Sequence, residues 1–92
     1  MPTRYVVMLS FPRGAPGEDE RNAQQAFLKE LQDEGALIMA GRFSDPSGGG
    51  MAVLEAESLD AARERYADAP VVASGRADWE IRPWEVSWSR NP

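Results

Sequence analysis

Two short apolar segments joined by a turn limit the fold more than any other feature of this chain. Residues 36–40 and 51–56 are apolar and strand-like, and between them lies Asp45-Pro46-Ser47-Gly48, followed by two more glycines. Aspartate before proline, with glycine three positions later, is typical of a type I turn. The segment therefore predicts a β-hairpin that carries one acidic side chain on its turn.

The rest of the chain predicts two helices and two more strands. Residues 4–10 are apolar on both alternating faces, which is typical of a central strand. An amphipathic helix is predicted from about residue 19 to 34, where Ala23, Phe27 and Leu31 recur every four residues and Gly35 provides a left-handed end. A second helix is predicted over residues 59–67, with Ser58 as N-cap and Pro70 preventing its continuation.

The last predicted strand, residues 78–88, changes its alternation near Pro83. Trp79 occupies an odd position before the proline, whereas Trp84 and Trp88 occupy even positions after it. Proline lacks the N–H group that a strand donates to its neighbour. We therefore expect a bulge or bend at Pro83, in an edge or intersubunit strand, that redirects the tryptophans.

The order β-α-β-β-α-β predicts an α+β fold, a ferredoxin-like sandwich with an antiparallel sheet and two helices on one face. The length fits a single domain over residues 1–92. Because the strands are apolar on both faces and the helices cover only one, we expect a homodimer whose open sheet faces pack together. Trp84 and Trp88 are the side chains that we expect at this contact.

Composition excludes several classes of function. The net charge of −5 and the scattered arginines argue against a nucleic-acid or anionic-membrane partner. The chain has no cysteine and no histidine, so it lacks thiol chemistry, a histidine to activate serine, and the usual zinc, copper or iron ligands. These absences leave only an all-oxygen metal site open, and we predict no metal and no cofactor. No apolar run is long enough to span a membrane, and the expected location is the cytoplasm.

Several segments, spread over almost the whole chain, carry a resemblance in their order and spacing: residues 5–7, 21–28, 35–41, 45–46, 49–58, 69–72 and 81–84. Together they resemble the YCII-related (YciI-like) domain family, a member of the dimeric α/β barrel group. The resemblance implies a ferredoxin-like dimer with a cleft near the dimer interface. In that cleft a histidine of the first helix and the aspartate of the second turn have been suggested as an acid/base pair.

The resemblance implies that Asp45 is the catalytic residue, a base for lyase, isomerase or dehydrohalogenase-like proton chemistry. The histidine position holds Gln24, which cannot exchange a proton near neutral pH. One alternative is a non-catalytic ligand-binding or regulatory module that keeps the cleft. Another is a structural dimer partner of a larger enzyme, in which Asp45 only caps its own turn.

Three arginines are candidate substrate-binding residues. Arg42 and Arg82 are candidate clamps for a substrate carboxylate, because a guanidinium group binds a carboxylate through two parallel hydrogen bonds. Pairing with a surface carboxylate is the commoner role for both, and Asp45 is close enough in sequence to pair with Arg42. Arg21 matches the family pattern on the first helix, where exposure to solvent is the usual explanation.

Two further residues are candidates for binding an unknown small molecule, a carboxylate or a ring compound. Gln24 can orient a substrate or a water by hydrogen bonds, or occupy a solvated helix position. Trp84 can line an apolar pocket for a ring-shaped ligand, or seal a subunit interface. Both roles of Trp84 are compatible in a cleft between two subunits.

Overall fold

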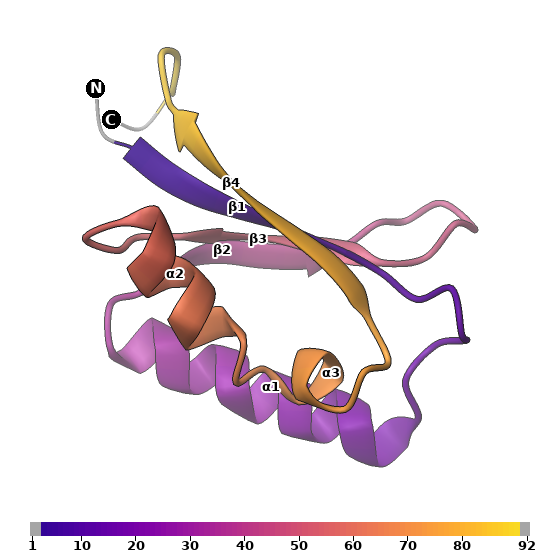
Figure 1. Ribbon diagram of the computed structural model, residues 1–92. Coiled ribbons are helices and arrows are strands. Elements are labelled where there is room, and N and C mark those ends of the chain that lie inside the picture. The colour runs from indigo at the N-terminus through magenta and orange to yellow at the C-terminus, as the bar shows by residue number, and fades with distance from the viewer. Residues whose placement is uncertain (1–2, 91–92) are drawn as a thin grey trace.

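The computed structural model describes residues 3–90, in which three helices cover one side of a four-stranded sheet (Figure 1). The antiparallel sheet has the strand order β2-β3-β1-β4, so β1 and β3 are central. The predicted ferredoxin-like α+β fold and the β2–β3 hairpin are confirmed. The elements in chain order are β1 (Thr3–Ser10), α1 (Glu18–Asp33), β2 (Leu37–Arg42), β3 (Gly50–Leu54), α2 (Leu59–Tyr66), α3 (Pro70–Ala73) and β4 (Asp78–Glu85).

The helix ends follow the local sequence. Gly35 has φ +79°, the left-handed conformation that ends α1. The hydroxyl of Ser58 accepts a hydrogen bond of 3.0 Å from the backbone N–H of Ala61, which confirms the predicted cap of α2. Pro70 does more than prevent the continuation of α2, since it begins the four-residue helix α3, which is too short to produce a periodic pattern.

The core lies between the sheet and the helices. Val7 of β1 and Leu31 of α1 are fully buried there, together with Tyr66 of α2. The buried positions of α1 are Gln24, Phe27 and Leu31. The expectation that Ala23 shares this face is wrong, because its side chain is exposed and a polar residue takes the core position.

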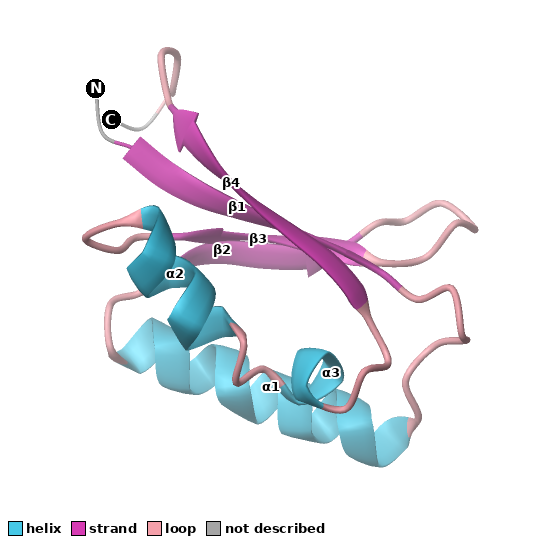
Figure 2. Ribbon diagram, viewed as in Figure 1, coloured by secondary structure: helices cyan, strands magenta, loops and turns pink. Residues whose placement is uncertain are grey.

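The other face of the sheet has no helix over it (Figure 2). The strand register places alternate side chains on this open face. The open-face residues are Arg4, Val6 and Met8 of β1, Met39 and Gly41 of β2, Met51 and Val53 of β3, and Glu80, Arg82 and Trp84 of β4. Most of these residues are apolar, which agrees with the prediction that the strands are apolar on both faces.

The expected bulge at Pro83 is wrong. Pairing of β4 with β1 is regular from Asp78 to Glu85, with Pro83 opposite Tyr5. An edge strand tolerates proline where the missing N–H would point away from its neighbour. The alternation changes because Trp84 lies on the open face and the strand ends at Glu85, before Trp88. The irregularity of the sheet lies in β2 instead, at its second residue.

Candidate functional site

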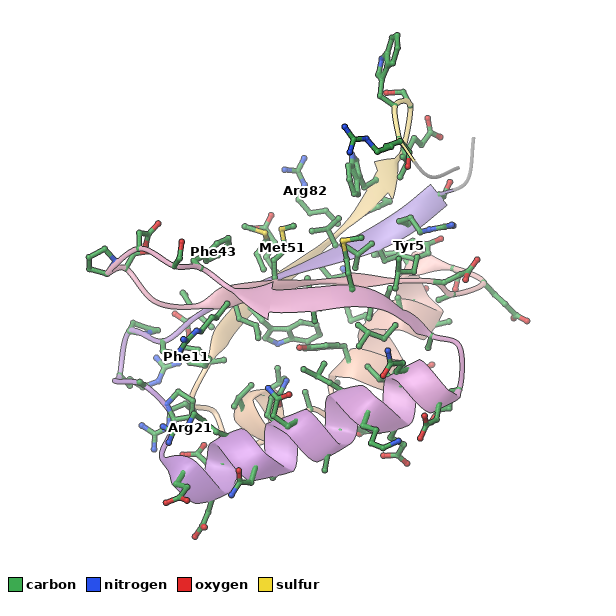
Figure 3. The ribbon with its side chains drawn as sticks, turned by 180° about the vertical axis from the view of Figure 1, so that it is seen from behind. Tyr5, Phe11, Arg21, Phe43, Met51 and Arg82 are labelled. Atoms are coloured by element: carbon green, nitrogen blue, oxygen red, sulfur yellow. The ribbon has the colours of Figure 1, made fainter. Side chains whose placement is uncertain are left out.

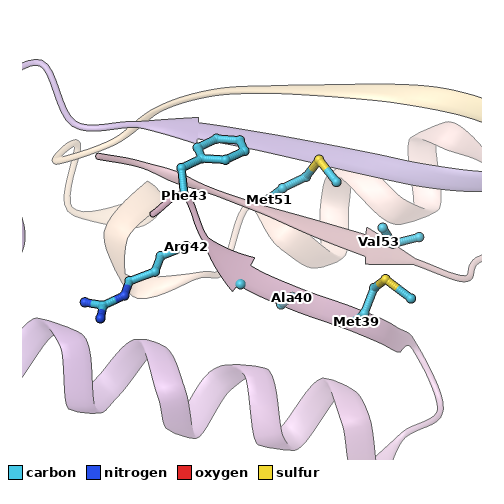
Figure 4. A pocket seen from close by; sticks show the side chains of 7 residues that line it. Met39, Ala40, Arg42, Phe43, Met51 and Val53 are labelled. Atoms are coloured by element: carbon cyan, nitrogen blue, oxygen red, sulfur yellow. The ribbon is translucent and has the colours of Figure 1, made fainter. Parts of the chain in front are cut away.

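A hollow of about 290 Å³ lies on the open face, where β2 and β3 enter their hairpin (Figure 4). Phe43, Met39 and Met51 line it, with exposed fractions of 36%, 62% and 37%. Val53 forms its buried part, although no helix covers this face. Figure 4 shows these four side chains on the same side of the sheet. The hollow is therefore shallow, apolar and suited to a flat ring.

Arg42 borders the hollow without reaching into it. Its backbone pairs with that of Gly50, and the side chain points away from Phe43 and Met51 (Figure 4). Among the described residues, no hydrogen bond or ion pair joins Arg42 to Asp45. The anion-clamp role of Arg42 stays a prediction.

Asp45 lies on the hairpin turn, exposed to solvent. Its Oδ1 atom accepts hydrogen bonds from the hydroxyl of Ser47 and, at 2.9 Å, from the backbone N–H of Ser47. The hydroxyl, more than the N–H, holds the pKa of Asp45 below its ordinary value of 3.8. Within one subunit, Asp45 is therefore an ionised turn cap, and its catalytic role stays a prediction.

Gln24 is buried between the helices and does not face the hollow. Its side-chain amide donates to the hydroxyl of Tyr66 at 3.2 Å, and its carbonyl oxygen accepts from the backbone N–H of Val71 at 3.4 Å. Burial raises the pKa of Tyr66, which the bond from Gln24 only partly offsets. The expectation that Gln24 occupies a solvated helix position is therefore wrong. Its expected contact with a substrate is not observed either, since both polar ends of the side chain are hydrogen-bonded to the protein.

Arg21 lies near the start of α1, on the helix side of the sheet (Figure 3). Its guanidinium donates a hydrogen bond of 3.1 Å to the carbonyl oxygen of Pro16. A polar hollow of about 370 Å³ lies at the same end of α1, lined by Arg13, Glu20, Ser74, Gly75 and Arg76.

The two arginines of this polar hollow are already neutralised. Arg76 contacts Glu20 with N···O distances of 3.0 and 2.9 Å, and Arg13 contacts Asp78 at 2.6 Å. The bonded guanidinium of Arg76 lowers the pKa of Glu20. Ion pairs therefore line this hollow. Because both arginines are paired, the described residues that line it offer no free cation for an anionic substrate.

Arg82 and Trp84 lie on the open face of β4. Figure 3 shows Arg82, Met51 and Phe43 on the side of the sheet opposite α1. The Nε atom of Arg82 lies 3.9 Å from Oε1 of Glu80, and the side chain of Trp84 is 47% exposed. Both are therefore accessible to a second subunit, and their substrate-binding roles stay predictions.

Comparison with known proteins gives the family. The model of the YCII-related domain matches residues 3–85. The chain belongs to the YCII-related domain family. YjpA, an uncharacterized protein of Bacillus subtilis (strain 168), is 45% identical to this YCII-related domain over 60 residues, which cover 65% of this chain and 69% of YjpA.

Two solved structures share the fold of this YCII-related domain. The 5-chloro-2-hydroxyhydroquinone dehydrochlorinase TftG of Burkholderia phenoliruptrix, in complex with 2,5-dihydroxybenzoquinone, has a TM-score of 0.70 and 18% identity, over 89% of this chain and 93% of that one. Muconolactone isomerase has a TM-score of 0.73 and 14% identity, over 97% and 96%. These identities establish the shared fold alone.

The structure divides the predicted site residues of this YCII-related domain into three groups. Arg42 and Asp45 lie at the hairpin, Arg82 and Trp84 on the open face of β4, and Gln24 and Arg21 on α1, where Gln24 is buried and Arg21 exposed. The substrate-binding role of Arg21 stays a prediction. The apolar lining of the hollow was not predicted from the sequence, although the signal for it was that residues 51–53 are apolar on both faces of the strand. No group of three potential metal-binding carboxylates occurs within residues 3–90, and none of the helices there is long and apolar enough to cross a bilayer.

Proposed function

We propose that this YCII-related domain is a homodimeric binding protein for a small ring compound, with its pocket on the open sheet face between two subunits. The observation that carries the proposal is the hollow beside Phe43 and Met51, on a face whose apolar side chains no helix covers. A contiguous exposed apolar face is typical of an interaction site. The aromatic ring and the thioethers suit a flat, partly apolar ligand.

The chemistry of the ligand is inferred from the hollow and from the shared fold. TftG is solved with a dihydroxybenzoquinone, and muconolactone isomerase is named for a lactone. Both names refer to compact oxygenated rings, which match the size and lining of the hollow. We therefore propose hydroxylated quinones and lactones as the ligand class. The cytoplasmic location stays a prediction.

Acid/base catalysis by Asp45 is the second candidate. It is supported by the position of Asp45 two residues after Phe43 and by its ionised state at neutral pH. A lowered pKa makes a weak base, and Gln24 supplies no proton from the helix layer. Binding without proton transfer therefore fits these observations better.

A thermal-shift screen with dihydroxybenzoquinones, lactones and small carboxylates tests both candidates. We expect a ring compound to raise the Tm of the natural protein and of Asp45→Ala, and to lose its effect on Phe43→Ala. Gln25→Ala is the matched control on the exposed side of α1. If no compound in this set stabilises the protein, the binding proposal is wrong for this ligand class. Turnover that disappears in Asp45→Asn supports the catalytic candidate instead.

A further inference from the structure

Trp88 is the most exposed large apolar side chain of the described residues, at 92%. It lies three residues after the end of β4, in a segment that turns away from the helices (Figure 1). A free indole of this size leaves a large apolar surface in water. The described part of the subunit covers almost none of Trp88, so its indole is accessible to another chain.

The hollow lies at the opposite corner of the sheet. Because β1 and β2 are both antiparallel to β3, they run in the same direction, whereas β4 runs against β1. The C-terminal ends of β2 and β4 therefore lie at opposite ends of the sheet. These two strands are also its two edges. Figure 1 shows the chain after β4 at one end and the β2–β3 hairpin at the other.

Symmetry brings these corners together. When two open faces pack on each other, the twofold axis lies between the sheets. The line that joins the two corners is a diagonal of the sheet. A twofold axis perpendicular to this diagonal, and parallel to the sheets, places the C-terminal segment of each subunit over the hairpin of the other. Both contacts form at once, which closes the dimer and leaves neither corner uncovered.

Each corner carries charges of both signs, and one pair can attract across the interface. Asp45 lies two residues after Phe43, and Arg90 lies two residues after Trp88. The carboxylate of Asp45 is ionised at neutral pH, since its ordinary pKa of 3.8 is far below 7 and the bonds from Ser47 lower it further. An ion pair between Arg90 of one subunit and Asp45 of the other would favour this pairing of corners over others.

We propose that Trp88 of each subunit covers the mouth of the hollow lined by Phe43 and Met51 of its partner, and that the ligand site is incomplete without this second aromatic wall. The inference rests on the proposed face-to-face dimer. In this proposal, a second copy of the chain covers the corner of the open face that carries the hollow. A flat ring then lies between an indole from one subunit and a phenyl group from the other.

Cysteine crosslinking tests the contact directly, because the natural chain contains no cysteine. In the double variant Ser87→Cys/Ser44→Cys, which keeps Trp88 and Phe43, the two thiols lie at opposite corners of one subunit and can meet only between subunits. We expect a short bis-maleimide to give a covalent dimer, in which mass spectrometry finds the peptide around position 44 linked to the peptide around position 87. The matched control is Ser87→Cys/Asp60→Cys, in which the second thiol lies on the exposed side of α2 and no covalent dimer is expected.

Sedimentation of single variants gives an independent readout. Trp88→Ala leaves the packing of its own subunit intact, and we expect it to weaken the dimer at least about tenfold in Kd, as truncation of a central aromatic contact does. Trp88→Phe is expected to retain most of the affinity. A natural chain that stays monomeric overturns both this inference and the proposed dimer. A natural dimer with no link between positions 44 and 87, or with an unchanged Kd in Trp88→Ala, overturns the inference alone.

Discussion

The side-chain amide of Gln24 donates a hydrogen bond to the hydroxyl of Tyr66, 3.2 Å away in the interior of the helix layer. The same side chain accepts from the backbone N–H of Val71 and so connects α1, α2 and α3. Tyr66 packs edge-on against Phe27, with ring centroids 5.6 Å apart. Gln24 therefore acts here as a structural connector in a buried polar network.

Replacing Gln24 by leucine should lower the free energy of unfolding by about 1–3 kcal/mol, because the Tyr66 hydroxyl and the Val71 N–H lose their buried partner. Urea unfolding measures this change. Gln25→Leu, on the exposed side of the same helix, should change stability by less than about 0.5 kcal/mol. Equal effects of the two substitutions would contradict a structural role for Gln24.

Gly49 should not tolerate a side chain. It has φ +80°, and an added Cβ would lie 2.3 Å from the carbonyl oxygen of Leu9. Gly48 has a similar φ of +75° but open space around it. We expect Gly49→Ala to destabilise the protein by at least about 2 kcal/mol and Gly48→Ala by about 1 kcal/mol. Thermal unfolding of the two variants separates the steric clash from the backbone conformation, and similar losses would contradict the close approach.

Met51→Lys should dissociate the proposed dimer and leave the subunit folded. The side chain lies on the open face and is 37% exposed in a single subunit, so a lysine there is accommodated until a second sheet covers it. Light scattering should report monomers at concentrations where the natural protein is dimeric, with an unchanged circular dichroism spectrum. Gln25→Lys adds the same charge on the helix side and should stay dimeric.

Stability should fall in acid through specific carboxylates. Hydrogen bonding to Arg65 lowers the pKa of Glu34 below its ordinary value of 4.5, with an N···O distance of 2.6 Å. The unfolded state therefore binds protons more readily, and this contribution is complete above the unfolded pKa and disappears as pH falls through the folded one. The stability gap between the natural protein and Glu34→Gln should be constant near neutral pH and should narrow as the pH falls through the ordinary pKa of 4.5 and below it.

Glu64→Gln, elsewhere on the exposed surface, serves as the control for the loss of one carboxylate. Its stability difference from the natural protein should vary less over the same pH range. A constant gap for Glu34→Gln would show that Arg65 does not stabilise the charged form.

The sequence predicted most of the architecture because its strands, hairpin and two long helices depend on local patterns. The Ser58 cap and the Gly35 helix end are contacts within a few residues of the chain. α3 was missed because four residues contain too little periodicity. β4 is an edge strand, as expected, but the bulge at Pro83 was wrong. An edge strand accommodates proline where the missing N–H points away from its neighbour, and that direction depends on the register with β1.

The candidate site was harder to predict than the fold. A resemblance assigns Gln24 to a pocket, whereas its burial depends on the partners Tyr66 and Val71, more than 40 positions away in sequence. The hollow depends on the β2–β3 register, which places Met39 opposite Val53. Local sequence patterns do not show which distant residues come into contact. They show even less about contacts with a second subunit.

The open face gives this cysteine-free protein a sensitivity to oxidants. Met8, Met39 and Met51, all the methionines within the described residues, lie on that face and are accessible to solvent. Oxidation to the sulfoxide would make these thioethers polar without disturbing the buried side chains beneath the sheet. Peroxide would thus impair the proposed association and ligand binding first, in a subunit that stays folded, and methionine sulfoxide reductases could reverse the damage.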